Sequence, residues 1–308
     1  MKVLVTCPPM LSSKEQFIPL FKENNIDVFC PDVTQTLSED ELIDLLPQFD
    51  GWIIGDDPAT RRVFEAGKKG IFKAAVKWGI GVDNVDFDAC MDLNIPITNT
   101  PGMFGSEVAE LAIGYLVGLA RETYLIDREV RSGKWPKNAG ITLEHKTIGI
   151  VGYGDIGENL TKKAKAFGLN IIIYDPAFNS VEDDEIKIYP WPENISNCDF
   201  IVFTCSLNSK NYHMFNKEVI SRCKDGVRVI NVARGGLIKE SDLCDSLKQG
   251  KVHSAALDVF ENEPLSNNSY LLAHPLCILG SHNASNTIEA VSKTNQKAIK
   301  LLLNFLKK

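Results

Sequence analysis

The sequence lacks the features that mark membrane proteins, nucleic-acid-binding proteins and disulfide-rich secreted domains. Its 308 residues contain no apolar run near the roughly 18 residues of a membrane span, and no N-terminal signal pattern. The 33 basic residues are outnumbered by 40 acidic ones and are scattered, which gives a net charge of -7. We therefore expect a cytoplasmic protein with a small-molecule substrate, and neither a nucleic acid nor a membrane as a partner.

The cysteine spacing indicates neither disulfides nor a metal site. Eight cysteines are widely separated, with no Cys-x-x-Cys pair and no cluster of Cys and His. Reduced thiols inside apolar runs are the simplest interpretation, and no bound metal is expected. A metal-dependent hydrolase, one alternative for this class of fold, therefore lacks a ligand set.

Alternation of apolar, β-rich runs with amphipathic segments predicts an α/β fold with parallel sheets. In the first hundred residues, strands are expected at 3–6, 26–30, 51–54, 73–78 and 95–98, and helices at 14–23, 39–46, 60–66 and 87–93. A second series of strands begins near Thr147, Ile171, Phe200, Val227, Val252 and Cys277. With 44% hydrophobic residues, the chain is long enough for two doubly wound domains.

Two helices are predicted to connect these domains. Residues 106–121 are apolar on nearly all sides, which suits a helix between domains or between subunits. The segment 284–306 has helical periodicity and is expected to return to the first domain. We expect one domain over 1–100 with 284–308, and the other over 101–283.

A glycine turn in mid-chain predicts dinucleotide binding. It follows an apolar run at 147–151, precedes a helical segment, and reads Gly152-Tyr153-Gly154-Asp155-Ile156-Gly157. The glycines permit a tight turn, close approach to a pyrophosphate and packing of helix on strand, while the helix N-terminus offers its amides to the anion. The candidate cofactor residues here are Gly152, Gly154, Asp155, Ile156 and Gly157.

The acid that ends the next apolar run indicates NAD rather than NADP. Asp175 lies 18 residues after Gly157 (175 − 157), near the roughly 20 expected for a carboxylate that accepts hydrogen bonds from ribose and repels a 2′-phosphate. Asp155 is less easily placed, because its charge lies beside the expected phosphates. We expect it to cap the helix with its side chain turned aside.

Three polar residues, Arg234, Glu263 and His282, each follow an apolar run downstream of the turn. Residues that follow the strands of a doubly wound sheet face one crevice, so the three are predicted to share a cleft. Singly they could be a surface ion pair, a loop carboxylate and a hydrogen-bonded histidine between domains. Together they supply what hydride exchange at a secondary alcohol needs: His exchanges the proton and Arg holds the neighbouring carboxylate.

Further motifs extend this interpretation over the whole chain. Besides the glycine turn, they are Lys77-Trp78-Gly79-Ile80-Gly81-Val82-Asp83-Asn84-Val85-Asp86, Asn99-Thr100-Pro101-Gly102 with Val108-Ala109-Glu110-Leu111, Asn231-Val232-Ala233-Arg234-Gly235-Gly236, and Ala256-Leu257-Asp258-Val259-Phe260. With them the sequence resembles the D-isomer-specific 2-hydroxyacid dehydrogenase family. The resemblance implies a flavodoxin-like substrate domain over 1–100 with 284–308, and a Rossmann NAD-binding domain over 101–283.

The resemblance also implies a reaction and its catalytic residues. The reaction is NAD-dependent interconversion of a small D-2-hydroxy acid and its 2-oxo acid, of the phosphoglycerate dehydrogenase or the hydroxypyruvate and glyoxylate reductase kind. His282 would be the general acid in carbonyl reduction, Glu263 would orient its ring, and Arg234 would hold the substrate carboxylate. Where the family usually has Thr-Pro-His and an apolar residue, this chain has Gly280-Ser281-His282-Asn283, so Asn283 is expected to alter the pocket.

Binding roles follow from the same resemblance. The loop Trp78, Gly79, Ile80 and Gly81 would bind the substrate carboxylate from the other domain. Asp258 would accept a hydrogen bond from the nicotinamide amide. Cofactor contacts are also expected at Ala233 and Cys205, although the segment Thr204-Cys205-Ser206-Leu207-Asn208 departs from the family's usual His-Val-Pro-Leu-Thr.

The choice of substrate stays open in the sequence. Phosphoglycerate would need cations near the first-domain loops. There the two acids Asp56 and Asp57 are followed by Arg61 and Arg62 one helical turn later and by Lys77 before the glycine loop. We favour one of these acids as a helix N-cap, with Pro58 in the first turn. Trp78 is either a pocket wall or a core residue.

Two further alternatives concern partners. The family also resembles co-repressors that keep the dehydrogenase body, so an NAD(H)-sensing binding protein is the alternative to an enzyme. The apolar helix at 106–121 and the arm through Trp135 predict a homodimer, unless the helix is buried between the domains of one subunit.

Overall fold

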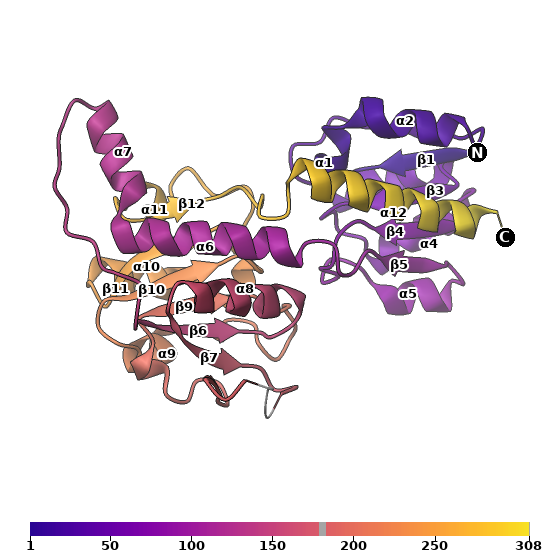
Figure 1. Cartoon of the computed structure of the whole chain (residues 1–308). Coiled ribbons are helices and arrows are strands. Elements are labelled where there is room, and N and C mark those ends of the chain that lie inside the picture. The colour runs from indigo at the N-terminus through magenta and orange to yellow at the C-terminus, as the bar shows by residue number, and fades with distance from the viewer. Residues whose placement is uncertain (179–182, 308) are drawn as a thin grey trace. The chain divides into compact units, whose positions relative to one another are not determined.

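The computed structural model describes residues 1–178 and 183–307 and divides into two compact units (Figure 1). The first unit is Met1–Phe104 with Ser285–Lys308, and the second is Gly105–Ala284. Each unit has its own parallel sheet covered by helices, so the expected α/β class is confirmed in both. The roles predicted for the two units, substrate binding for the first and NAD binding for the second, stay predictions.

The first unit contains a five-stranded parallel sheet in the order β2-β1-β3-β4-β5. Its strands are β1 (Lys2–Val5), β2 (Asp27–Phe29), β3 (Gly51–Ile54), β4 (Ala74–Lys77) and β5 (Ile97–Asn99). Its helices are α1 (Pro8–Leu11), α2 (Lys14–Lys22), α3 (Glu39–Leu45), η1 (Leu46–Gln48), α4 (Arg61–Lys69), α5 (Phe87–Asp92) and α12 (Ile288–Leu306). This is the flavodoxin-like strand order. The C-terminal helix α12 packs on β3 and β4, and Leu302 lies against Gly51.

The predicted N-cap at Asp56 or Asp57 is wrong, because Thr60 caps α4. The Thr60 hydroxyl accepts a hydrogen bond from the Val63 amide. Asp57 is fully buried instead, and its carboxylate accepts hydrogen bonds from the Leu37 amide at 2.9 Å, the Gly55 amide at 3.1 Å and the Thr6 hydroxyl. Burial raises the pKa of this carboxyl, although its hydrogen bonds act in the opposite sense.

The second unit contains a seven-stranded parallel sheet in the order β12-β11-β10-β9-β6-β7-β8. Its strands are β6 (Thr147–Val151), β7 (Asn170–Tyr174), β8 (Ile186–Ile188), β9 (Phe200–Phe203), β10 (Val227–Asn231), β11 (Val252–Leu257) and β12 (Ile278–Leu279). Its helices are α6 (Gly105–Arg121), α7 (Thr123–Arg131), α8 (Asp155–Ala166), η2 (Ile195–Asn197), α9 (Lys217–Arg222), η3 (Gly235–Leu237), α10 (Glu240–Lys248) and α11 (Tyr270–Ala273). The order reverses between β6 and β9, as in a Rossmann fold with one added edge strand.

The apolar helix α6 is buried mainly by its own unit. It packs against α8 and against the strands β10, β11 and β12. Its buried residues include Val108, Ala112, Leu116 and Leu119. Packing within the unit therefore explains most of the apolar surface that the sequence offers as a dimer contact.

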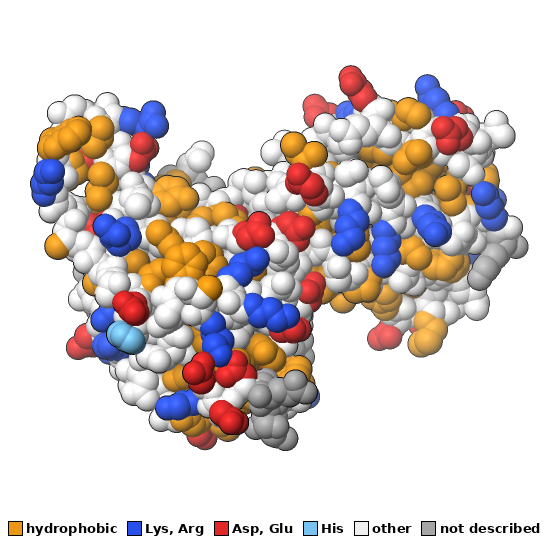
Figure 2. Space-filling model, viewed as in Figure 1, with side chains coloured by type: hydrophobic (Ala, Val, Ile, Leu, Met, Phe, Trp, Pro, Cys, Tyr) orange, Lys and Arg blue, Asp and Glu red, His pale blue; other side chains and the backbone are white. Residues whose placement is uncertain are grey.

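The cysteines agree with the expectation of reduced thiols. All eight cysteines are free thiols, five of them buried. Within the described parts of the chain, no helix combines the length and the apolar surface needed to cross a bilayer. Basic and acidic side chains are interspersed over the face shown in Figure 2.

Candidate active site

The glycine turn lies between the end of β6 and the start of α8. Gly152 has a φ of +101°, and its carbonyl accepts a hydrogen bond from Thr204 Oγ1 at 2.8 Å. A Cβ on Gly157 would stand 2.1 Å from the Gly152 oxygen, so the helix packs directly on the loop backbone, as only glycine permits. A Cβ at the N-cap Gly154 would meet none of the described atoms within 4 Å. This end of α8 therefore has room for an anion, and the turn fits a dinucleotide.

Asp155 is the first residue of α8, and the prediction that its side chain caps this helix is wrong. The N-cap is Gly154, and the side chain of Asp155 accepts a hydrogen bond from Asn159 Nδ2 at 3.2 Å. Its carboxylate lies against the start of α6, where a Cβ on Gly105 would be 2.2 Å from Oδ1. A carboxylate is favoured beside the N-terminus of a 17-residue helix such as α6. Ile156 follows Asp155 in the first turn of α8.

Asp175 stands at the carboxyl end of β7 and fixes two loops. Its Oδ2 accepts a hydrogen bond from the Tyr153 amide at 2.7 Å, and its Oδ1 accepts one from the Ala177 amide at 2.9 Å. Each carboxylate oxygen has more than one lone pair, so both can still accept hydrogen bonds from ribose hydroxyls. The same carboxylate that would bind the ribose therefore also holds the glycine turn in place.

Cys205 borders the turn through its backbone, and Ala233 lies in the loop after β10. A Cβ on Gly152 would stand 2.6 Å from the Cys205 backbone. Burial raises the pKa of the Cys205 thiol to about 12, so it is neutral at pH 7. The Ala233 amide donates to Asn231 Oδ1 at 3.1 Å. Both residues shape the loops at this edge of the sheet without adding charge.

The structure brings His282 and Glu263 together. Nδ1 of His282 lies 2.7 Å from Oε2 of Glu263, and both side chains are mostly buried. Because an ionised carboxylate only accepts, Nδ1 is the donor in this contact, which fixes the tautomer of the ring. The other carboxylate oxygen of Glu263 accepts the Phe260 amide at 3.0 Å, which fixes its orientation.

Asp258 holds the backbone turn that carries His282. Its carbonyl accepts the His282 amide at 2.7 Å, and its Oδ2 accepts the Ala284 amide at 2.8 Å. The Tyr115 hydroxyl of α6 donates to Oδ1 at 3.4 Å. Burial raises the pKa of Asp258, and backbone hydrogen bonds from Asn283 and Ala284 oppose the rise. Both carboxylate oxygens and the carbonyl of Asp258 therefore already accept hydrogen bonds from within the protein.

Arg234 follows β10, the strand next to β11 in the sheet. Its Nη1 donates to the Ala233 carbonyl at 2.9 Å, and its own carbonyl accepts Asn231 Nδ2 at 2.9 Å. Asn231 therefore shapes the whole turn, a role that the sequence interpretation missed. The signal available was its position as the last residue of a buried strand, directly before Val232-Ala233-Arg234.

The loop after β4 belongs to the first unit and is rigid at its start. Gly79 has a φ of +109° and donates its amide to Thr100 Oγ1 at 2.8 Å, so this amide is already used. The Trp78 side chain is buried against Phe104, and its Nε1 donates to Asn295 at 2.8 Å. Trp78 therefore fills the core of its unit. Of the predicted substrate loop, Ile80 and Gly81 are partly exposed.

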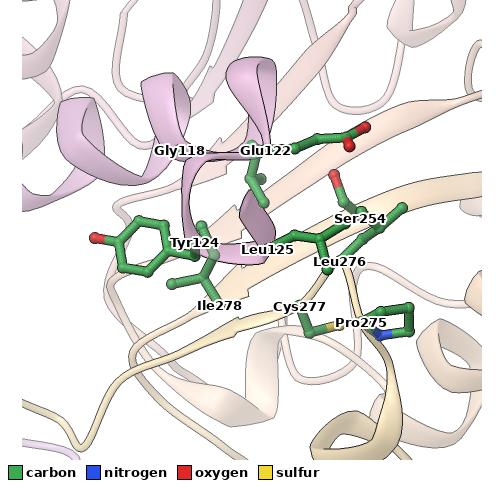
Figure 3. Close-up of a pocket in the computed structure, with 10 residues that line it drawn as sticks. Gly118, Glu122, Tyr124, Leu125, Ser254, Pro275, Leu276, Cys277 and Ile278 are labelled. Carbon is green, nitrogen blue, oxygen red and sulfur yellow. The ribbon is translucent and has the colours of Figure 1, made fainter. Parts of the chain in front are cut away.

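A small pocket lies away from these residues, where the elbow between α6 and α7 meets β11 and the segment before β12 (Figure 3). Gly118, Glu122, Ser254 and Cys277 are among the residues that line it. Its volume of about 10 Å³ admits at most one water molecule. It is therefore too small for an organic acid or a cofactor.

Comparison with known proteins agrees with this geometry. A parallel sheet of Rossmann order, a glycine turn, a ribose acid and an oriented imidazole define a nicotinamide-dependent dehydrogenase. The family model described as D-isomer specific 2-hydroxyacid dehydrogenase, NAD binding domain, matches residues 113–284. A hydroxypyruvate reductase of Thermotoga maritima is 36% identical over 262 residues, which is 83% of this chain and 85% of that protein.

Further relatives extend the likeness to other members. A D-3-phosphoglycerate dehydrogenase of Archaeoglobus fulgidus is 32% identical over 94% of this chain, which spans only 54% of that protein. The structure of an NAD-dependent formate dehydrogenase from Staphylococcus aureus in complex with NAD matches with a TM-score of 0.85 and 25% identity, over 99% of this chain and 95% of that one. The chain belongs to the D-isomer-specific 2-hydroxyacid dehydrogenase family. It is an NAD-dependent oxidoreductase, and nothing in these comparisons supports the co-repressor alternative.

The packing of α8 on the glycine turn predicts the effect of Gly157→Ala. The added methyl would meet the Gly152 oxygen at 2.1 Å, so the turn must shift and the anion-binding amides move with it. We expect NADH affinity to fall at least about tenfold in fluorescence titration. Gly114→Ala in α6 is the matched control, because its Cβ meets no described atom within 4 Å, and it should bind NADH normally. Unchanged affinity in Gly157→Ala would contradict the assignment of the turn.

Proposed function

We propose that this enzyme reduces a small 2-oxo acid with His282 as the general acid, Glu263 as the group that orients it and Arg234 as the ligand of the substrate carboxylate. The 2.7 Å contact between Glu263 and the His282 ring carries this proposal. It fixes the tautomer and favours the protonated ring, which is the form that donates a proton. The guanidinium of Arg234 matches a carboxylate with two parallel hydrogen bonds.

NADH, held by the glycine turn and Asp175, would supply the hydride in reduction, and NAD⁺ would accept it in oxidation. The chain's own residues handle the proton and the orientation. His282 Nε2 would give a proton to the carbonyl oxygen during reduction and take it back during oxidation. Asp258 would keep the His282 turn in place and accept a hydrogen bond from the carboxamide of the cofactor. Ile80 and Gly81 would offer backbone amides to the substrate carboxylate.

The charges around the loop after β4 favour an acid without a phosphate. Lys77 is 3% exposed, and its Nζ is bound to Asp56 Oδ1 at 3.1 Å and to the Trp78 carbonyl at 2.9 Å. Its charge is therefore compensated within the unit. A phosphate dianion beside this loop would be repelled by the Asp56 carboxylate and would gain little from Lys77, whose charge is already paired. We assign the substrate class as unphosphorylated 2-hydroxy and 2-oxo acids.

Steady-state kinetics on purified protein test this assignment. With NADH as donor, hydroxypyruvate or glyoxylate should be reduced with a kcat/KM at least about tenfold above that for phosphohydroxypyruvate. A reversed preference would overturn the substrate class while leaving the redox function intact. Failure to oxidise NADH with these acids and with a wider panel of 2-oxo acids would overturn the proposed function itself.

His282→Asn tests the role of the imidazole. His282 has a φ of +56°, a conformation that Asn tolerates better than Ala, so this variant should keep the backbone turn. Without a proton donor, kcat should fall by about 10² to 10⁴ while NADH binding is kept. His145→Asn is the matched control, since His145 also has a positive φ of +64° but is exposed. Parallel loss of turnover and cofactor binding would mark His282 as a structural residue.

The exposed apolar side chains and the free thiols of the chain fit a homodimer in the cytoplasm. Apolar side chains gather over α7 and the arm after it (Figure 2), where Tyr124, Val130 and Trp135 are exposed. Trp135 is 76% exposed, which is unusual for so large an apolar side chain. Eight free thiols suit a reducing compartment.

Light scattering tests the dimer. The wild-type protein at micromolar concentration should have twice the 34.1 kDa mass of one chain. Trp135→Asp places a charge in the proposed interface and should shift the population toward monomer. Met91→Asp, at a 72% exposed apolar residue on α5, is the matched control and should stay dimeric. A monomeric wild type would overturn this part of the proposal.

A further inference from the structure

Three loops of the second unit meet in a cluster of titratable side chains outside the proposed catalytic residues. His213 lies in the loop after β9, Glu240 begins α10 after the β10 loop, and Glu261 lies in the loop after β11. We call these three residues the loop clasp. None of them is among the residues that the sequence assigned to catalysis or binding.

Glu261 binds the start of α10. Its Oε1 accepts a hydrogen bond from the Glu240 amide at 2.8 Å, and its own amide donates to Glu240 Oε2 at 3.5 Å. The arrangement is the reciprocal bonding of a helix capping box, made between two separate loops. Burial raises the pKa of Glu240, and the nearby charge of Glu261 adds to the rise.

His213 completes the clasp from a third loop. Its Nε2 lies 2.8 Å from Glu261 Oε1, so the imidazole ring packs against that carboxylate. Backbone pairing places the ring: the His213 amide donates to the Gly236 carbonyl at 2.7 Å, and the Phe215 amide donates to the Leu237 carbonyl at 3.0 Å. The loop after β9 is therefore attached to the loop that carries Arg234.

The clasp is joined by backbone contacts to the loops that carry Arg234 and Glu263. A Cβ on Gly235 would stand 1.9 Å from the Phe260 carbonyl, so the loop that follows Arg234 rests on the backbone beside Glu261. Glu263 is only two residues further, and its carboxylate is bound by the Phe260 amide of the same turn. Movement of Glu261 would therefore be passed to Glu263 through one short and rigid turn.

We infer that Glu261 and His213 are positioning residues that hold the Glu263 loop against the Arg234 loop and so keep the Glu263 carboxylate on the His282 ring. Neither needs to touch substrate or cofactor. The kinetic consequence rests on the proposed function, but the structural consequence at His282 does not. A loss of the clasp should weaken the support of the imidazolium before it weakens cofactor binding.

Glu261→Ala removes both contacts of the carboxylate, whereas Glu261→Gln keeps an oxygen for the Glu240 amide. We expect kcat to fall about 10- to 100-fold in Glu261→Ala and less in Glu261→Gln, with the KM for NADH nearly unchanged. Asp245→Asn, at an exposed residue of the same helix α10 that pairs with Lys248, is the matched control and should keep wild-type kinetics.

Titration of the histidine rings by NMR in the cofactor-free protein gives a readout that does not depend on turnover. Glu263 and Asp258 are two of the titratable groups near His282, and the clasp holds the first of them. In Glu261→Ala the His282 signal, assigned by its absence in His282→Asn, should titrate about half a pH unit lower than in wild type. The Asp245→Asn variant should show no shift.

The outcomes separate the two proposals. An unmoved His282 titration together with a wild-type kcat in Glu261→Ala overturns the clasp. An equal loss of NADH affinity, kcat and melting temperature also overturns it, since that pattern marks general damage to the fold. An inactive wild-type enzyme overturns the proposed function alone, because the shift in the His282 titration still tests the clasp.

Discussion

Parallel pairing of three neighbouring strands is the constraint on which the proposed site depends. In the register of the sheet, Asn231 of β10 lies beside Leu257 of β11, and Leu257 lies beside Leu279 of β12. The strands therefore end level with one another, and the chain leaves all three at the same edge. Arg234, Glu263 and His282 follow those ends by three, six and three residues (234 − 231, 263 − 257, 282 − 279). Segments far apart in sequence thus meet without long connections, which is how open α/β sheets gather functional groups.

Buried polar side chains then convert this edge into fixed geometry. Asn231 binds the backbone of Ala233 and of Arg234, and Asp258 binds the turn that carries His282. Leaving such groups unpaired would cost about 1–3 kcal/mol each, so the loops are held in the conformation that pairs them. The His282 backbone, at a positive φ, is stabilised by the same bonds. Rigid support of this kind is what proton transfer requires, because small displacements of a catalytic group are costly.

Local sequence patterns predicted the parts of the molecule that local forces determine. Apolar runs located the buried strands, and the glycine turn located the start of α8. The edge strand β8 was missed because its three residues, Ile186–Ile188, are only partly buried and give no apolar run. The caps proposed at Asp57 and Asp155 failed for a different reason. Their carboxylates face partners 51 and 50 residues away, Thr6 and Gly105, and no spacing along the chain reveals such contacts.

In the loop after β4 of the first unit, the positive charge of Lys77 stabilises the fold of the loop and is not available to bind a ligand. A lysine that is almost fully buried is stable only if its ammonium is paired and hydrogen-bonded, and Lys77 meets both needs through Asp56 and the Trp78 carbonyl. Those contacts, with the bond from Gly79 to Thr100, fix the backbone at the start of the loop. What the loop can still offer to a ligand is its amide dipoles. In the proposed function these amides would bind the carboxylate that all 2-oxo acids share, and selection among the acids would come from the groups around the remaining atoms of the substrate.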